Sequence, residues 1–502
     1  MLGGALFFWA LILVKWGLEG YVADNPRALP GWMCSPLFWG PVTIVVVMPF
    51  WLVLRRLWRR ISGSPSAEHA KRSEGEAAQD DGEDGEVSSH QMQTQTTLEG
   101  LSRELARMGR HPDPEKIKPL IDRVLSRAIA LHASDVHFEP AGSSLMIRFR
   151  IDGTLVDAAR LPIKMHRNLF NRLKVMSNLT PFERAVPQDG RVVAKIAGRA
   201  FDIRISFLPT INGEKSVLRI LESDAATFDV TRLGFSKRLL ADYCDLLTRP
   251  QGIIFVTGPT GSGKTTTMYA SLNYIKAGSD STINIVAIED PVEYVMAGFS
   301  QTQVNEEIGL SFSKGLRTIL RQDPDVIMVG EIRDLETAQV ALQAGLTGHL
   351  MLTTVHAEST VGVFTRLVNM GIEPFQLASA ATGVLSLRLV RRLCEQCRQV
   401  VPLTPRERSL LGEVGMDLTE GAQFYSAAGC DVCLGTGFSG RSLIAELLTV
   451  KEEMRGAIIN NEPAGELARH AREAGMTTLL EDGLRKAIAG TTSVAEVLRV
   501  TR

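Results

Sequence analysis

The sequence predicts an α/β protein of several domains, and three observations lead to this class. The chain has 502 residues, which is too long for one ordinary hydrophobic core. In its second half, short apolar runs typical of buried strands alternate with helical patterns, at Ile253–Val256, Ile283–Ile288 and Val326–Val329. The glycine-rich segment GPTGSGKT directly follows the first of these runs. Such alternation predicts a largely parallel sheet.

The composition argues against two broad classes of protein. Lys and Arg number 55 and Asp and Glu number 56, so the chain as a whole has no basic field that would attract nucleic acid, and no nucleic-acid partner is expected. Four of the six cysteines occur as two C-x-x-C pairs, which suit a metal ion better than the disulfides of a secreted protein. A reducing compartment is therefore expected.

The first 60 residues predict a membrane anchor. Trp32–Leu54 is a run of 23 residues without a charge, which is long enough to span a bilayer. Four arginines follow it and favour the cytoplasmic side: Arg55, Arg56, Arg59 and Arg60. The shorter run Leu2–Val14 is either the first arm of a membrane hairpin or a signal-peptide or interfacial segment. A buried core helix is the alternative for the longer run. We expect a hairpin over residues 1–60, with the rest of the chain in the cytoplasm.

Two further segments precede the glycine-rich loop. Residues 61–112 are rich in Ser, Gly, Glu, Asp and Gln with little to bury, and they predict an acidic flexible linker. Residues 113–222 predict a small α/β domain, because apolar residues recur at helical spacing from Ile117 to Leu131. Alternating patterns then predict strands at Ser144–Arg150 and Ala200–Ser206.

The segment GPTGSGKT predicts a nucleotide site. It matches G-x-x-x-x-G-K-[ST] and lies between the predicted strand Ile253–Val256 and a helix-compatible run, Thr266–Tyr274. In such a loop, backbone N–H groups and the helix N-terminus face the β-phosphate, while the lysine neutralises charge and the hydroxyl binds magnesium. The predicted ATP- and Mg²⁺-binding residues are Gly258, Pro259, Thr260, Gly261, Ser262, Gly263, Lys264, Thr265 and Thr266.

Two carboxylates follow predicted strands of the same sheet. Glu331 comes after Val326–Val329, with Gly330 at the position where an Asp usually ends such a strand, so Glu331 is expected to act on magnesium or its water. Glu293 closes the segment EDPVE after Ile283–Ile288 and is the candidate for activating the attacking water. A surface carboxylate and a solvated acidic turn are the alternatives.

Two histidines flank a third apolar run. His349 and His356 lie seven residues apart around Leu350–Val355, and either could reach the γ-phosphate from the end of a strand. A structural hydrogen-bonding histidine is the alternative for each.

The cysteine pairs predict a metal site. Cys394, Cys397, Cys430 and Cys433 form two knuckles separated by 32 residues, so four thiolates can converge on one zinc ion. Closed ligation by four thiolates indicates a structural ion rather than a catalytic one. Free or redox-active thiols are the alternative.

Taken together, these segments resemble the secretion traffic ATPases of type II secretion and type IV pilus assembly, from about Ile117 to the C-terminus. The matching stretches, besides the four cysteines, are SDVHFEP from Ser134, FRIDG from Phe149, GPTGSGKTTT from Gly258, IEDPVEY from Ile288, LRQDPDVIMVGEIRD from Leu320 and TGHLMLTTVH from Thr347. The resemblance implies a RecA-like P-loop ATPase core at 223–392, a PAS-like domain at 113–222, a zinc insert at 393–436 and a helical C-terminal part at 437–502.

The resemblance also implies roles for individual residues. It gives catalytic roles to Glu293, Glu331, His349 and His356. It makes Arg204 and Arg219, from the domain before the loop, candidates for an arginine clamp on the phosphates. Surface solvation is the alternative for both arginines. Such enzymes resemble ring hexamers that push on an integral inner-membrane platform protein.

The predicted function is an ATP-hydrolysing motor at the bacterial inner membrane, with its catalytic domains on the cytoplasmic face. The family usually carries a further folded N-terminal docking domain, which the apolar hairpin and linker here cannot supply, so the membrane tether is expected to replace it. A nucleotide-gated scaffold with little turnover is the first alternative. A pilus-retraction motor is the second, and the predicted zinc module and long preceding domain favour an assembly enzyme over it.

Overall fold

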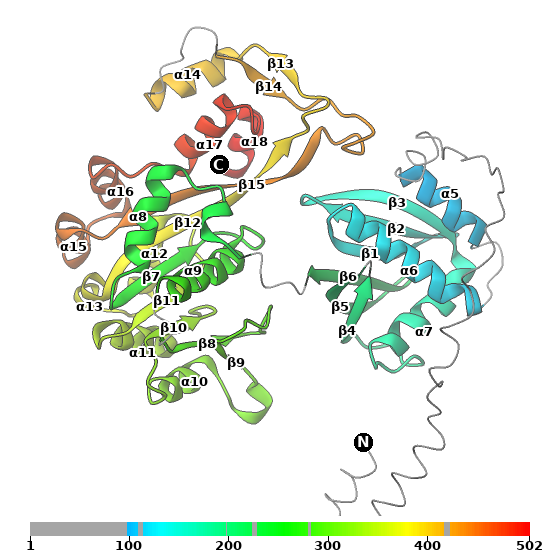
Figure 1. Cartoon of the computed structure of the whole chain (residues 1–502), viewed down its shortest axis with the longest axis horizontal. Coiled ribbons are helices and arrows are strands. Elements are labelled where there is room, and N and C mark those ends of the chain that lie inside the picture. The colour runs from blue at the N-terminus through cyan, green and yellow to red at the C-terminus, as the bar shows by residue number, and fades with distance from the viewer. Residues whose placement is uncertain are drawn as a thin grey trace, which may run out of the picture. The chain divides into compact units, whose positions relative to one another are not determined.

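The computed structural model describes residues 98–108, 114–196, 198–222, 228–279, 283–415 and 422–501. The predicted membrane segments, Leu2–Val14 and Trp32–Leu54, lie outside these ranges, as does most of the predicted linker. Within the described ranges, no helix is both long and apolar enough to cross a membrane. Two large sheets organise this part of the chain, one in an N-terminal and one in a C-terminal domain (Figure 1).

An antiparallel sheet forms the N-terminal domain, with six strands in the order β3-β2-β1-β6-β5-β4. Val136 and Phe138 are buried in its core, while the alternate positions of the same strand face the other way and carry polar side chains such as Glu139. This period of two is typical of a sheet with one apolar face. The strands are β1 Ala133–Ala141, β2 Ser144–Ile151, β3 Thr154–Pro162, β4 Gln188–Ile196, β5 Arg199–Thr210 and β6 Gly213–Glu222.

Three helices complete the core of the N-terminal domain: α5 Leu98–Met108, α6 Pro114–Ala130 and α7 His166–Met176. Helix α6 and the strands β2 and β5 confirm the elements predicted in this domain. Helix α5, however, lies inside the predicted linker over residues 61–112. Its Leu101 and Leu105 are four residues apart and buried in the core. The linker prediction is therefore wrong at its end, because the polar average composition concealed a short amphipathic stripe.

A seven-stranded sheet forms the C-terminal domain, in the order β15-β12-β7-β11-β10-β8-β9. All neighbours from β12 to β9 are parallel, and only the edge strand β15 is antiparallel to its partner. This confirms the prediction of a largely parallel sheet. The strands are β7 Gly252–Thr257, β8 Ile285–Glu289, β9 Ser300–Gln303, β10 Val326–Val329, β11 Leu350–Thr354, β12 Ala381–Leu393 and β15 Phe438–Thr449.

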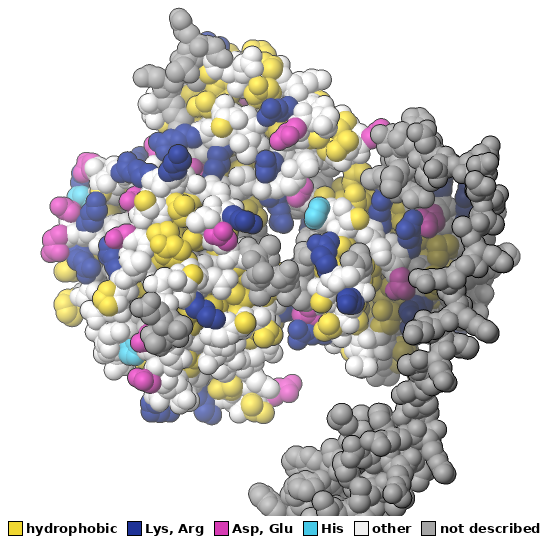
Figure 2. Space-filling view, in the orientation of Figure 1, with side chains coloured by type: hydrophobic (Ala, Val, Ile, Leu, Met, Phe, Trp, Pro, Cys, Tyr) yellow, Lys and Arg dark blue, Asp and Glu magenta, His cyan; other side chains and the backbone are white. Residues whose placement is uncertain are grey.

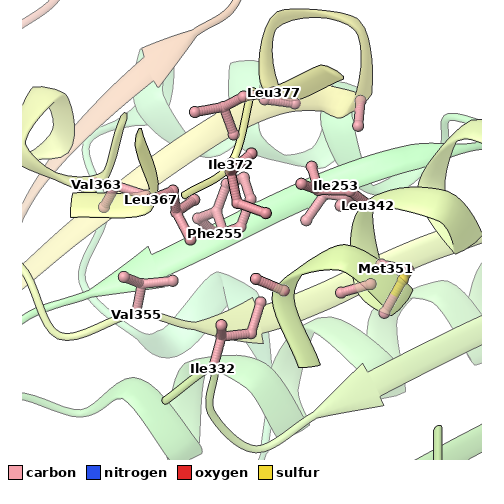
Figure 3. Packing of buried hydrophobic residues seen from close by; sticks show 14 of the residues in the cluster. Ile253, Phe255, Ile332, Leu342, Met351, Val355, Val363, Leu367, Ile372 and Leu377 are labelled. Carbon is pink, nitrogen blue, oxygen red and sulfur yellow. The ribbon is translucent and has the colours of Figure 1, made fainter. Parts of the chain in front are cut away.

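Helices cover both faces of this second sheet. Ile253 and Phe255 of β7 belong to one buried cluster, and Ile254 and Val256 of the same strand belong to another. Figure 3 shows the first cluster, in which Ile253 lies beside Leu342. Burial on both faces explains why the strands read as continuous apolar runs. The helices are α8 Lys237–Leu247, α9 Lys264–Gly278, α10 Phe312–Ile319, α11 Leu335–Leu346, α12 Thr360–Asn369, α13 Pro374–Ala380, α15 Glu452–Ile459 and α16 Ala464–Glu473.

The C-terminal part departs from its prediction as a helical region over residues 437–502. It begins with strand β15, which pairs along its length with β12. The segment 443–448 of this strand is continuously buried, so its pattern cannot be distinguished from that of a buried helix by periodicity. After α15 and α16, helices α17 Leu479–Ile488 and α18 Val494–Thr501 end the chain and share a small core with Leu411 and Phe424.

The described surface carries charges of both signs. On the face shown in Figure 2, basic and acidic side chains are interspersed and hydrophobic side chains gather only in small groups. This distribution agrees with the formal net charge of −1 for the whole chain.

Candidate nucleotide site

The predicted phosphate loop connects the buried strand β7 to helix α9. Gly258, Gly261 and Gly263 have φ values of +146°, +74° and +95°, a region that residues with a side chain rarely adopt. A Cβ on Gly258 would also lie 2.5 Å from the carbonyl oxygen of Leu387. The glycines are thus required for the tight path of the backbone, which brings the N-terminus of α9 to the C-terminal edge of the sheet.

This loop forms one wall of a cavity of about 450 Å³. The other walls come from the ends of β8, β10 and β11, and from β12 and β15. Of the sequence-predicted residues, the cavity is lined by Thr260, Gly261, Gly263, Lys264, Thr265, Thr266, Glu293, Glu331 and His356. Ligands of open α/β sheets bind at this carboxyl edge of the strands.

Lys264 is held inside the loop. Its Nζ donates to the carbonyl oxygens of Gly258 at 2.9 Å and Pro259 at 3.0 Å. Burial lowers the pKa of the Lys264 ammonium, and the nearby charge of Glu331 opposes that shift. The ammonium group is therefore partly desolvated, and a phosphate would offer it stronger acceptors than two carbonyl groups.

Glu331 lies between two cationic or potentially cationic side chains. Arg333 pairs with one of its oxygens, and Nε2 of His356 lies 3.2 Å from the other. Its side chain is only 16 % exposed. Gly330, which replaces the usual strand-end Asp, accepts a hydrogen bond from the Thr354 hydroxyl at 2.7 Å, which ties β10 to β11 beside this carboxylate. A carboxylate so placed, near Thr265, suits the coordination or outer hydration of Mg²⁺.

Glu293 belongs to an acidic loop, defined here as residues 290–299 between β8 and β9. Its carboxylate lines the cavity and lies 2.8 Å from a guanidinium nitrogen of Arg204 on β5. The same nitrogen donates to the carbonyl oxygen of Val292 at 3.1 Å. Arg204 is thus in contact with the acidic loop and neutralises its glutamate.

Arg219 is placed differently from Arg204, although both lie on the polar face of the same sheet. Its Nε donates to Asp135 on the neighbouring strand β1 at 3.1 Å, and its side chain is 61 % exposed. Of the two predicted clamp arginines, the structure therefore brings only Arg204 to the acidic loop.

The two histidines are separated by strand β11. His356 follows the carboxyl end of the strand and lines the cavity. His349 precedes its amino end, where Nδ1 lies 3.1 Å from the carbonyl oxygen of Ala344 and the His349 carbonyl accepts from the N–H of Gly252. An extended strand rises about 3.3 Å per residue, so one chain cannot bring both rings to the same γ-phosphate. The structure places only His356 at the cavity.

The cavity also contains residues that the sequence reasoning missed. Arg441 and Leu389 enter from β15 and β12. Glu289 and Asp290 also line the cavity, and both belong to the segment EDPVE that the sequence places at this strand end. The sequence indicates Glu289 at the end of this buried strand but assigns no role of its own to it. Nothing in the sequence predicted Arg441, because β15 was not recognised as part of the sheet.

The four cysteines form a separate cluster. Their sulfur atoms all lie within 4.8 Å of one another, with separations of 3.8 Å for Cys394–Cys430 and 3.7 Å for Cys397–Cys433 and Cys430–Cys433. Zinc–thiolate bonds of about 2.3 Å in a tetrahedron give sulfur separations of about 3.8 Å, so this donor set fits zinc. Burial opposes ionisation of the Cys433 thiol, but the N–H groups of Cys430 and Gly437 lower its pKa to about 7. The spacer between the pairs contains helix α14 Pro405–Glu413 and a two-stranded antiparallel sheet of β13 Gln399–Val401 with β14 Phe424–Ser426.

Comparisons with known proteins show which family this chain is related to. Residues 111–499 match the family described as Type II/IV secretion system protein. The chain is 46 % identical over 390 residues to Type II secretion system protein E of Pseudomonas aeruginosa, covering 78 % of this chain and 76 % of that protein.

Two solved structures share the fold. The ATPase DotB of Legionella pneumophila has a TM-score of 0.57 at 20 % identity and covers 76 % of this chain and 95 % of its own. The pilus retraction motor PilT, solved with bound ADP, has a TM-score of 0.50 at 24 % identity and covers 76 % of this chain and 96 % of its own. The family match spans most of the chain and the relative from Pseudomonas is 46 % identical, so the chain belongs to the type II/IV secretion system family of ATPases.

Proposed function

We propose that this chain is an ATP-hydrolysing motor that works as a homohexamer and powers pseudopilus assembly in type II secretion. The observation that carries the proposal is the cavity in which the phosphate loop faces both Glu293 and Glu331. The 46 % identity to a type II secretion system protein E supports type II secretion over type IV pilus assembly.

The nucleotide is bound by the phosphate loop in this proposal. Lys264 and the loop N–H groups hold the β- and γ-phosphates, as the partial desolvation of Lys264 favours. The Thr265 hydroxyl and Glu331, the latter directly or through water, hold Mg²⁺, which supplies charge neutralisation at the phosphoryl group. Both residues line the same cavity, and their oxygen donors suit this ion.

Hydrolysis is assigned to the acidic loop and to His356. Glu293 orients the attacking water and accepts its proton. His356, which contacts Glu331 at 3.2 Å, donates a hydrogen bond toward the γ-phosphate. His349 is assigned a structural role in the turn before β11, because its ring contacts the carbonyl of Ala344.

Arg204 supplies the cation from the N-terminal domain. Its guanidinium lies 2.8 Å from Glu293, and during phosphoryl transfer it exchanges this contact for the developing negative charge, which it stabilises. Release of Glu293 from this ion pair also frees the carboxylate to act as a base. Arg219 is assigned a supporting role, since Asp135 already pairs with it.

The remaining parts support assembly and placement. The four cysteines hold a structural Zn²⁺, as their separations favour. Residues 1–60 tether the chain to the bacterial inner membrane with the catalytic domains on the cytoplasmic face. The partner that receives the motion is an integral inner-membrane platform protein.

The first test separates turnover from scaffolding. Phosphate release by the full-length chain is measured with and without Mg²⁺, for the wild type and Lys264→Ala. A motor gives magnesium-dependent release that Lys264→Ala abolishes. Release that is absent, or that does not change with the substitution, supports the nucleotide-gated scaffold.

The second test concerns the direction of the motor. In the native host, the gene is deleted and then restored as wild type or Glu293→Gln, and secreted protein and filaments are quantified. An assembly motor loses both in the deletion and with Glu293→Gln. Filaments that persist or accumulate without the gene indicate a retraction motor and contradict the proposal.

A further inference from the structure

One carboxylate in the lining of the cavity, that of Glu289, is buried and has no role in the proposed hydrolysis. Glu289 ends strand β8 and is only 4 % exposed. The Tyr269 hydroxyl donates to its Oε2, and Nε2 of Gln301 donates to its Oε1 at 2.9 Å. Burial raises the pKa of this carboxyl, and the two hydrogen bonds oppose the shift. Both carboxylate oxygens therefore accept hydrogen bonds from the protein, so Glu289 has a structural role and is not available as a base.

The side chains of Tyr269 and Gln301 also hold the backbone of the acidic loop. The N–H of Tyr294 lies 3.5 Å from the Tyr269 hydroxyl, and the carbonyl of Tyr294 accepts from Gln301 Nε2 at 2.9 Å. Oε1 of Gln301 accepts from the N–H of Met296 at 2.7 Å. The residue that follows Glu293 is thus fixed at both its N–H and its carbonyl group.

Side chains must supply this support, because residues 290–299 form neither helix nor strand. On the other side of Glu293, the N–H of Val292 donates to Oε1 of Gln303 at 3.2 Å. The backbone is therefore held immediately before and immediately after Glu293. A rigid backbone at this point restricts where the carboxylate can lie, and catalytic groups lose rate when displaced by as little as about 1 Å.

Tyr269 connects this support to the phosphate loop. It lies on α9, five residues after Lys264 and on the same rigid element. Its ring is fully buried and packs edge-on against Tyr294, with centroids 5.9 Å apart and an angle of 89°. Phe228 packs against both tyrosines, at 5.4 and 5.0 Å between centroids. The hydroxyl is therefore fixed relative to the helix that presents the phosphate-binding lysine.

We propose that Tyr269 is a positioning residue for hydrolysis. Through the buried carboxylate of Glu289 and the main chain of Tyr294, it fixes the distance between the phosphate-binding end of α9 and Glu293. The proposal rests on the role of Glu293 given under Proposed function. It assigns no contact with the nucleotide to Tyr269, so loss of its hydroxyl affects the rate of the chemical step and leaves nucleotide binding intact.

The chain offers a matched control for this test. Tyr243 is likewise fully buried, and its hydroxyl shares a hydrogen bond of 2.8 Å with Ser271, which is also on α9. Tyr243→Phe therefore removes one buried hydroxyl that contacts the same helix but has no link to the acidic loop. Both substitutions can lower the melting temperature, but only Tyr269→Phe is expected to lower kcat.

The experiment measures kcat and KM for Mg-ATP with the full-length chain, using phosphate release sensitive enough for slow variants, and melting temperature alongside. Tyr269→Phe is expected to lower kcat roughly tenfold, with KM within about twofold of the wild type, because one hydrogen bond in a network is lost. Tyr243→Phe is expected to keep kcat within about twofold. In a Glu293→Gln background, Tyr269→Phe is expected to have no further effect, since the carboxylate that it positions is gone.

A second variant keeps the test decisive at measurable rates. Gln301→Ala removes the other half of the support, and combined with Tyr269→Phe it is expected to reduce kcat no more than the worse single variant, because both act through one loop. The proposal is overturned if the two effects multiply, if Tyr243→Phe lowers kcat as much, or if Tyr269→Phe acts equally in the Glu293→Gln background.

Two further outcomes separate this proposal from the proposed function. Wild-type turnover by Glu293→Gln refutes the role of Glu293 itself. A slow Glu293→Gln together with normal turnover by Tyr269→Phe refutes only the positioning role of Tyr269.

Discussion

The two sheets of this chain place their functional groups in opposite ways. The parallel sheet is buried on both faces, so its chemistry is confined to the carboxyl ends of its strands, where Lys264 and Glu331 meet in one cavity. The antiparallel sheet is buried on one face and carries charged side chains on the other, among them Arg204 and Arg219. A group at a strand end is fixed by the sheet, whereas a group on an open face depends on its neighbours.

The largest expected effect lies at the strand ends. Lys264→Ala removes the cation that faces the phosphates, and kcat is expected to fall on the order of a thousandfold. Lys237→Ala, an exposed lysine at the start of α8, is the control and is expected to leave turnover unchanged. Phosphate release under saturating ATP measures both. Comparable losses in the two variants would mean that charge in general, and not the phosphate loop, determines the rate.

The arginines test the open face. Arg204→Ala is expected to lower kcat about a hundredfold with little change in ATP affinity, because its charge acts mainly in the transition state. Arg219→Ala is expected to lower kcat by no more than about threefold, since that side chain pairs with Asp135 within its own sheet and the structure does not bring it to the acidic loop. Steady-state kinetics and nucleotide titration distinguish the two. An equal loss of affinity and turnover in Arg204→Ala contradicts a transition-state role.

The histidines test the two ends of a single strand. His356→Ala is expected to lower kcat roughly tenfold, because it removes one hydrogen bond at the cavity. His349→Ala is expected to lower the melting temperature instead, since its ring contacts the Ala344 carbonyl at the other end of β11. If His349→Ala lowers kcat while the melting temperature is unchanged, the structural role of His349 is wrong. The histidine then acts on a nucleotide that is not bound in the cavity of the same chain.

The cysteine cluster, remote from the strand ends in sequence, has the smallest expected effect on chemistry. Cys394→Ser, or treatment with a chelator, is expected to lower the melting temperature by roughly 5 °C while nucleotide affinity stays normal. Metal content and thermal unfolding are measured together, with Cys244→Ser as the control outside the cluster. Unchanged melting and metal content in Cys394→Ser would exclude a structural zinc at these thiols.

The strand ends were the part of this molecule that the sequence could predict. The run Val326–Val329 coincides with β10, and the phosphate loop, Glu331 and Glu293 all come to one cavity, because parallel strands bring their carboxyl ends to one edge. Short sequence runs are enough to predict these strands and the residues that follow them. The start of helix α9 at Lys264 can be predicted in the same way from the glycine-rich motif.

Contacts between segments far apart in the chain could not be predicted from the sequence. Strand β15 pairs with β12 across the whole cysteine region, and its buried run has no period that separates strand from helix, so Arg441 was missed. Arg204 pairs with Glu293 and Arg219 with Asp135, and these partners come from other segments of the chain. The contact of Tyr269 with the residue after Glu293 likewise joins two segments. Such partners are set by packing between segments far apart in the chain.

The central claim is that the acidic loop at the edge of the parallel sheet performs hydrolysis. Its most direct test is Glu293→Gln, with kcat and ATP affinity measured on the same full-length preparation. The account predicts that kcat falls about a hundredfold while ATP binds as in the wild type, since the base is lost and the phosphate loop is intact. Turnover within twofold of the wild type would contradict it.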